Sequence, residues 1–99
     1  MARIREYRSI IKTLLSDYAQ YPPANGHIEM ETIFDDAQDH YQLIALGWQG
    51  KKRIHGCVIH IDLKQDKVWL QHDNTDAEIA NKLVKMGIPA TQIVLGFLT

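Results

Sequence analysis

Three residues in the second half of the chain, His60, Asp62 and Asp73, are of the types that hold divalent metal ions. His60 and Asp62 alternate along a segment with strand character, so that both side chains fall on one face. A single histidine with two aspartates lacks the two-histidine spacing of zinc sites. We therefore expect these side chains to be structural and hydrogen-bonded, and we predict no catalytic residue and no cofactor.

A second pattern, Asp62-Leu63-Lys64, has the form of the acid-x-Lys half of a metal-dependent nuclease. Such an enzyme needs a further acid from a preceding strand, and the sequence does not select among the candidates Glu29, Glu31, Asp35 and Asp36. A metal-dependent nuclease or hydrolase using His60, Asp62 and Asp73 therefore stands as the alternative to a non-enzymatic function.

Helical periodicity marks the start of the chain. The apolar positions Ile4, Tyr7, Ile11, Leu14 and Tyr18 recur at three- and four-residue spacing and predict one helix, which should end before Tyr21-Pro22-Pro23. The sequence from Thr75 to Glu78 has the form of a capping box and predicts that a second helix begins there and ends at Gly87. The segment 93–97 is too short to assign.

Between the helices lie four segments with strand character, near 27–34, 40–48, 53–63 and 67–72. The short connections between them allow only antiparallel neighbours. Because 99 residues suffice for one hydrophobic core, we predict a single α+β domain over residues 1–99. Its architecture is a four-stranded antiparallel meander with an N-terminal helix and a C-terminal helix, in the order α-β-β-β-β-α.

A two-residue hairpin loop at Gln65-Asp66 would pair Lys64 with Lys67 and divide the last two strands between two faces. The apolar face, which the helices should cover, then collects Cys57, Ile59, Ile61, Leu63, Val68 and Leu70. The opposite face collects Val58, His60, Asp62, Trp69, Gln71 and Asp73, with His60 opposite Gln71 and Val58 opposite Asp73. On the apolar face Cys57 should be an inert small hydrophobe and not a nucleophile.

Two helices can hardly cover both sides of such a sheet, and the segment 41–48 adds apolar residues of both parities. We therefore expect the second face, with Trp69, His60 and Gln71, to be buried against a partner or another copy of the chain. The protein should form a homo-oligomer, either a dimer or a higher assembly.

Charge argues against autonomous DNA binding, because 11 Lys and Arg against 12 Asp and Glu give a net charge of -1. Basic residues concentrate at Arg5, Arg8 and Lys12 and at Lys51, Lys52 and Arg53, which could meet an acidic partner or simply form a solvated helix face and a charged turn. The segment between them, from Asp17 to Asp39, contains six acidic residues and no Lys or Arg. One cysteine and the lack of a leader or a long apolar stretch favour a cytoplasmic protein without membrane contact.

Several strings are more specific than these patterns. They are DHYQL at 39–43, GWQG at 47–50, GCVIHID at 56–62, VWLQHD at 68–73, GIP at 87–89 and IVLGF at 93–97. In this order and spacing the chain resembles the XisI family of cyanobacterial excision-controlling factors.

The resemblance implies a small cytoplasmic α+β accessory protein that helps to control removal of the fdxN element during heterocyst differentiation. In that family a separate recombinase cuts and rejoins the DNA, and a nuclease-related XisH-like protein is often encoded nearby. We therefore expect regulation through protein contacts and at most indirect association with DNA. A third possibility is that the chain neutralises a XisH-like partner.

Overall fold

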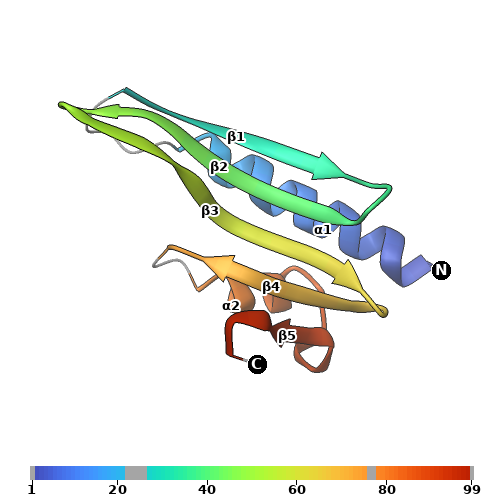
Figure 1. Cartoon of the computed structure of the whole chain (residues 1–99). Helices are drawn as coiled ribbons and strands as arrows, with labels where there is room; N and C mark the ends of the chain where they lie inside the picture. Colours follow the sequence, from blue (N-terminus) through green and yellow to red (C-terminus); the bar gives the residue numbers. More distant parts are fainter. Residues whose placement is uncertain (1, 22–26, 76–77, 99) are drawn as a thin grey trace.

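The computed structural model describes residues 2–21, 27–75 and 78–98. Within them, helix α1 (Ala2–Ala19) precedes the strands β1 (His27–Asp35), β2 (His40–Gln49), β3 (Lys52–Lys64) and β4 (Lys67–Asp73). Helix α2 (Ile79–Lys85), a 3-10 turn η1 (Ala90–Gln92), strand β5 (Ile93–Leu95) and a second 3-10 turn η2 (Gly96–Leu98) follow. The strands form one sheet in the order β1-β2-β3-β4-β5 (Figure 1).

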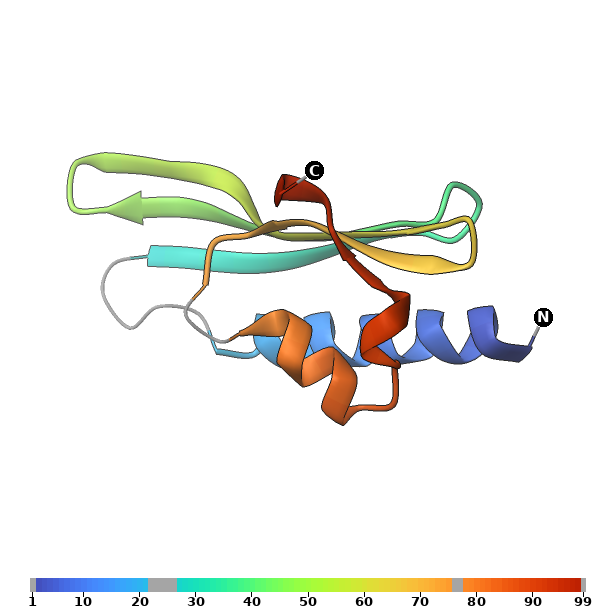
Figure 2. The same cartoon turned by 90° about the horizontal axis from the view of Figure 1, so that it is seen from below.

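Both helices pack on the same face of the sheet (Figure 2). The buried stripe of α1, formed by Tyr7, Ile11, Leu14 and Leu15, lies in one hydrophobic core with Ile79 and Leu83 of α2 and with the inward side chains of the strands. The helix predicted from Ile4 to Tyr18 is thus confirmed, as is the helix-facing role of Ile59, Ile61, Leu63, Val68 and Leu70. We call the opposite side of the sheet the open face.

The sheet has five strands and not the four predicted, and it is mixed and not purely antiparallel. Strand β5 pairs with β4 in parallel, with Trp69 opposite Val94. A parallel neighbour requires a crossover of a dozen or more residues. Helix α2 and the turn η1 supply that crossover, so the short segment left unassigned in the sequence becomes an edge strand.

Helix α2 also begins later than the capping-box pattern predicts. Glu78 is the N-cap residue, its backbone is left-handed with φ 52°, and its side chain makes no capping hydrogen bond. The Thr75 hydroxyl and amide both donate to Asp73 Oδ1, at 2.6 and 3.0 Å. Asp73 therefore accepts from the Thr75 amide, which in a capping box would donate to the carboxylate of Glu78. Residues 76 and 77 of the pattern lie outside the described residues. The predicted end of this helix at Gly87 is close to the observed end at Lys85.

Two β-bulges change the predicted register. Strand β3 pairs with β4 as expected from Lys64, opposite Lys67, to Ile61, opposite Leu70, and then shifts so that His60 lies opposite His72 and Ile59 opposite Asp73. Gln71 is the extra residue. The predicted pairs of His60 with Gln71 and of Val58 with Asp73 are therefore wrong, because one inserted residue moves every later side chain to a new partner.

The second bulge separates Cys57 from Ile59 in the pairing with β2, where Leu43 lies opposite Ile59 and Ile44 opposite Cys57. Val58 is the extra residue, and it packs against the core. Ile44 stands between buried Leu43 and Ala45 and so points to the open face, where its partner Cys57 also lies. The predicted places of Cys57 and Val58 are exchanged.

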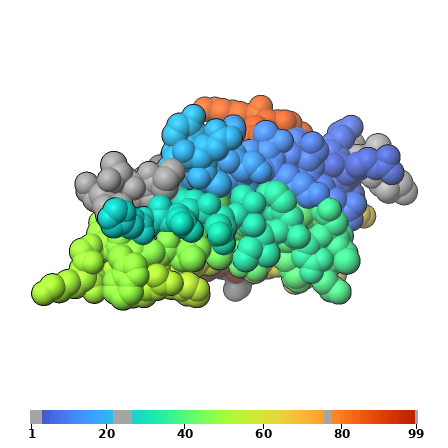
Figure 3. Space-filling view, turned by 90° about the horizontal axis from the view of Figure 1, so that it is seen from above, coloured from blue at the N-terminus to red at the C-terminus, as the bar shows by residue number. Residues whose placement is uncertain are grey.

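The elongated molecule measures 46 × 25 × 22 Å, and the tip of the β2–β3 hairpin extends beyond α1. Figure 3, seen from the β1 edge, shows β1 running beside α1 along this length. The two-residue loop Gln65-Asp66 is confirmed, with both residues at positive φ, 56° and 62°, as a primed hairpin turn requires. No helix in the described ranges is long and apolar enough to cross a membrane.

Candidate functional site

The open face carries an apolar stripe that no helix in the described part of the chain covers. Ile44 and Leu46 are half-buried in the middle of β2, while Ile33 and Trp48 are 47% and 50% exposed. Glu31 and Glu29 on β1 stand opposite Ile44 and Leu46. The face thus combines apolar side chains that water solvates poorly with an acidic border.

Next to this stripe lies a cluster of His40, His60 and Asp62, the most buried charged residue of the described chain at 7% exposure. His40 Nδ1 and His60 Nε2 each approach Asp62 Oδ1 at 2.7 Å. Gln71 Nε2 donates to the other oxygen, Oδ2, at 3.3 Å. We call these four residues the His-Asp cluster.

Strand geometry explains why these side chains meet. His40 is the first residue of β2 and lies directly opposite Asp62 of β3, and His60 precedes Asp62 by two residues on the same face. The bulge at Gln71 leaves that side chain unpaired in the ladder and able to reach Asp62. The His-Asp cluster is therefore built from three neighbouring strands, with one residue from β2, two from β3 and one from β4.

The carboxylate of Asp62 has imidazoles, and no Lys or Arg, as its ion-pair partners among the described residues. A hydrogen bond from His40 to Asp62, with the attraction of that carboxylate, raises the pKa of His40 above its ordinary value. Among the described residues, the hydrogen-bond and ion-pair partners of Asp62 are two imidazoles and an amide, without Lys or Arg. A carboxylate removed from water in this way depends for its stability on the hydrogen bonds and positive charges that its neighbours supply.

Trp69 lies opposite Asp62 and is half-buried. The ammonium of Lys64 sits 4.8 Å from the centre of its ring, a cation-π distance. The indole Nε1 is buried and has no hydrogen-bond partner in the part of the chain that is described. Trp69 therefore belongs to the surroundings of the His-Asp cluster and is not a freely exposed contact residue.

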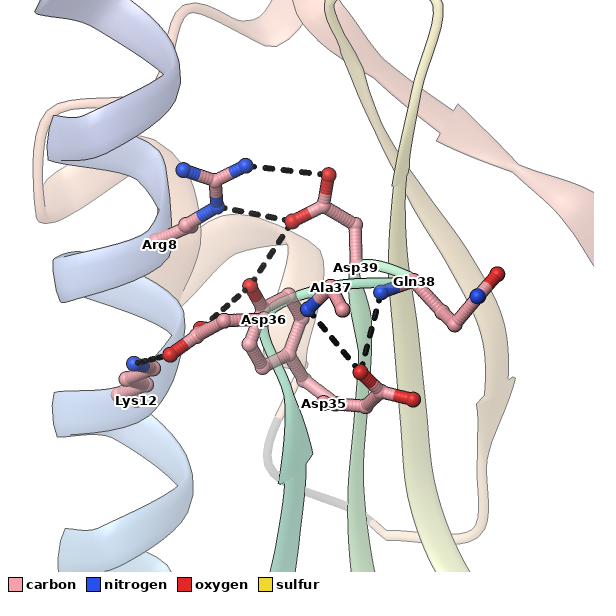
Figure 4. A network of polar contacts seen from close by, with 8 residues as sticks. Arg8, Lys12, Asp35, Asp36, Ala37, Gln38 and Asp39 are labelled. Atoms are coloured by element: carbon pink, nitrogen blue, oxygen red, sulfur yellow. Dashed lines mark hydrogen bonds and ion pairs between the residues drawn. The ribbon is translucent and has the colours of Figure 1, made fainter.

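A second polar group, which we call the helix-side network, ties the β1–β2 turn to α1 (Figure 4). Arg8 donates from Nε and Nη2 to the two oxygens of Asp39, at 2.8 and 3.2 Å, and Lys12 Nζ donates to Asp36 at 2.7 Å. The hydroxyl of buried Tyr41 lies 3.0 Å from both Asp36 Oδ1 and Asp39 Oδ1. This network fixes the turn that leads into β2 at His40.

The shifts of pKa in the helix-side network follow from its ion pairs. The hydrogen bond from Arg8 holds the pKa of Asp39 below its usual range, and the hydrogen bond from Lys12 does the same for Asp36. Burial, with the two nearby carboxylates, raises the pKa of Tyr41. Both aspartates are thus charged and paired at neutral pH.

The structure brings together two of the three residues that the sequence offered as candidate metal ligands and that we expected to be structural. His60 and Asp62 meet, whereas Asp73 is opposite Ile59 and uses its carboxylate to hold Thr75. His40 takes its place, a residue that the sequence patterns had not singled out. His40 could have been identified only from its place opposite Asp62 on the neighbouring strand, and that place is known only when the β2–β3 register is known.

The other predicted contact residues are distributed over both ends of the molecule. Arg8 and Lys12 are engaged in the helix-side network, while Arg5, Lys51, Lys52 and Arg53 are exposed. The guanidinium of Arg53 lies 5.4 Å from the ring centre of Trp48, at the edge of the apolar stripe.

The geometry gives no support to a nuclease built on the acid-x-Lys pattern or to Cys57 as a nucleophile. In the described residues no second carboxylate joins Asp62 among the potential metal ligands, although the acid-x-Lys nuclease pattern needs one. Burial raises the pKa of the Cys57 thiol, which donates to the Ile59 carbonyl at 3.3 Å. A thiol with a raised pKa is a poor nucleophile at neutral pH.

Comparison with known proteins agrees with this fold. The family model described as XisI protein matches residues 1–99. A XisI-like protein from Anabaena variabilis ATCC 29413, whose crystal structure is known, shares 41% sequence identity with this chain. The two structures match with a TM-score of 0.82 over 95% of this chain and 85% of that one.

A second crystal structure, of the fdxN element excision controlling factor XisI from the same organism, is 28% identical. Its TM-score is 0.79 over 96% of this chain and 92% of that one. Among curated proteins there is no match. A family match over the full sequence, together with two related structures that share the fold, shows that the chain belongs to the XisI family.

Proposed function

We propose that this protein is a non-enzymatic accessory factor that controls excision of a DNA element through protein contacts. Membership of the XisI family supports the proposal, as does the similar solved structure named as an fdxN element excision controlling factor. By this analogy the setting is heterocyst differentiation in a cyanobacterium. A net charge of -1 supports an indirect association with DNA, through the partner.

The observation that carries the proposal is the apolar stripe of the open face. Ile33, Ile44, Leu46 and Trp48 line it, and side chains of this kind favour burial against a complementary surface. Arg53 beside Trp48 adds a cation at its border, and Glu29 and Glu31 add acids on the other side. A patch with both charges at its rim can fix the orientation of a partner.

The test uses charge placed in the stripe. Ile44→Glu and Trp48→Glu should abolish complementation of a deletion strain, measured as the excised DNA junction by quantitative PCR. The matched control is Val84→Glu, because Val84 is an exposed apolar residue of α2, away from the open face, at 41% exposure. Normal excision with both stripe variants would contradict the proposal.

A second copy of the chain and a XisH-like protein are the partners to examine first. Sedimentation of the purified protein should show a dimer or a larger assembly that Trp48→Glu dissociates and Val84→Glu does not. Mixing with a XisH-like protein should give a complex sensitive to the same variant. A monomer at all concentrations that also leaves the XisH-like protein unbound would count against contact through this face.

A further inference from the structure

We propose that His40, His60 and Asp62 form a binding site on the open face for one divalent transition-metal ion of the zinc class. The three potential ligand atoms lie within 4.8 Å of one another. Two imidazole nitrogens and a carboxylate oxygen are a ligand set that suits such ions, and they suit Mg²⁺ or Ca²⁺ poorly. The proposal is independent of any partner, and so of the proposed function.

The charge of the cluster gives the reason to expect a cation. Asp62 is 7% exposed, and the imidazole nitrogens of His40 and His60 converge on the same oxygen of its carboxylate, each at 2.7 Å. In the helix-side network the comparable carboxylate of Asp39 is matched by a guanidinium. A bound divalent ion would give Asp62 a permanent positive partner and would replace two hydrogen bonds to one oxygen with direct ligation.

The scaffold permits this with small movements. Ligands about 2.0–2.1 Å from a tetrahedral ion are separated by about 3.4 Å. The side chain of His40 is 50% exposed, so its ring can turn toward that separation while Asp62, at 10% side-chain exposure, stays fixed. Gln71 donates to Asp62 Oδ2 and holds the carboxylate plane, which is the usual role of a group that contacts a ligand from outside.

Three protein ligands leave a coordination position open, as in zinc sites that bind water or another ligand. His40 is exposed and His60 is half-buried, so this position lies on the solvent side of Asp62, on the open face. A side chain of another protein could fill it, and the metal would then strengthen a contact made there.

The test is zinc binding by the full chain, freed of purification tags and treated with EDTA before dialysis. Calorimetric titration with ZnCl₂ should show about one ion per chain, with MgCl₂ silent. Co²⁺ should give the visible absorption of a tetrahedral site. His40→Ala and His60→Ala should each weaken zinc binding by at least tenfold, because even partners outside the coordination shell change affinity by about 10–100-fold.

The matched control is His55→Ala, an exposed histidine of β3 five positions before His60. It should leave zinc affinity unchanged. Asp62→Asn keeps the shape of the buried side chain and should also lose binding, and circular dichroism of each variant reports whether it folds. Absence of zinc binding by the folded wild-type protein would overturn the proposal. So would equal affinity in His40→Ala, His60→Ala and His55→Ala, which would mean an adventitious ion only.

Discussion

Each face of the sheet carries a polar cluster, and the three consecutive residues 39–41 are divided between the two clusters. Asp39 and Tyr41 belong to the helix-side network, and His40 between them belongs to the His-Asp cluster. On the helix side the carboxylates meet Arg8 and Lys12. On the open face the more deeply buried carboxylate meets imidazoles and an amide. The helix-side network pairs its carboxylates with cations and anchors the β1–β2 turn to α1. The His-Asp cluster has no such pair with Lys or Arg among the described residues and can accept the metal ion that we propose.

The largest difference in stability should be between the apolar layers of the two faces. Ile61 is fully buried under the helices, and Ile44 is half-buried on the open face. Ile61→Ala should lower the free energy of unfolding by about 3–4 kcal/mol, because it leaves a cavity in the core. Ile44→Ala should lower it by less than about 1 kcal/mol, since water already reaches the site.

Urea unfolding at low protein concentration measures both changes. An equally large loss for the two variants would contradict this expectation, because it would mean that the open face is covered in the free protein. A cost of Ile44→Ala that grows with protein concentration would instead show burial between copies.

The polar clusters should differ in the same sense. Asp39→Asn leaves the guanidinium of Arg8 without its bidentate acceptor and should destabilise the fold by about 1–2 kcal/mol. Asp62→Asn keeps an oxygen that can accept from the imidazoles and breaks no ion pair with Lys or Arg among the described residues, so the stability of metal-free protein should fall by less than in Asp39→Asn. Thermal unfolding in EDTA compares the two variants. An equal loss would make the His-Asp cluster as structural as the helix-side network.

Acid should act on the helix-side network. The pKa of Asp39 and that of Asp36 are lower in the folded chain than in the unfolded one, because Arg8 and Lys12 donate to them. Their contribution is therefore fully present above the ordinary carboxyl pKa of about 4 and is lost as pH falls through the lower, folded values.

Unfolding temperatures measured from pH 6 down to pH 2 should fall less steeply in Arg8→Met than in the wild type. Arg5→Met is the control, since Arg5 is an exposed arginine on the same helix. Identical pH profiles for wild type and Arg8→Met would remove the electrostatic role assigned to this network.

The smallest expected effect is that of Lys12→Met. The ion pair of Lys12 with Asp36 is solvent-accessible, with side-chain exposures of 35% and 58%. The unfolding temperature should change by no more than about 2 °C, and added salt should abolish the difference. A larger change would indicate that the exposed end of the network contributes more than its Arg8 end.

Periodicity in the sequence was sufficient to predict most of the core. The three- and four-residue spacing of Tyr7, Ile11 and Leu14 predicts the buried stripe of α1, and alternation from Ile59 to Leu63 predicts the helix-facing side of β3. These signals are local, since each depends only on the geometry of one element. The β5 pairing is different, because three residues carry too little pattern to be recognised and are placed by the crossover of α2.

The candidate site depended on features without a local signal. Counting from the pair Gln49 and Lys52 places Ile61, and not Asp62, opposite His40. The bulge at Val58 inserts one residue into β3 and so places Asp62 opposite His40. The bulge at Gln71 shifts Asp73 to a position opposite Ile59, away from the His-Asp cluster. Bulges arise from the competition between twist, packing and register across strands, so an unbroken alternation pattern could not reveal them.

The position of β1 at the edge of the sheet limits how another molecule can attach. An edge strand can act as a template for sheet extension, which in the extreme leads to fibres. Glu29 and Glu31 are exposed on β1, and a second β1 strand aligned beside them would crowd like charges together. Growth of a continuous sheet through the β1 edge is thereby opposed, so the association of copies that we propose would have to run across the face of the strands and not along this edge.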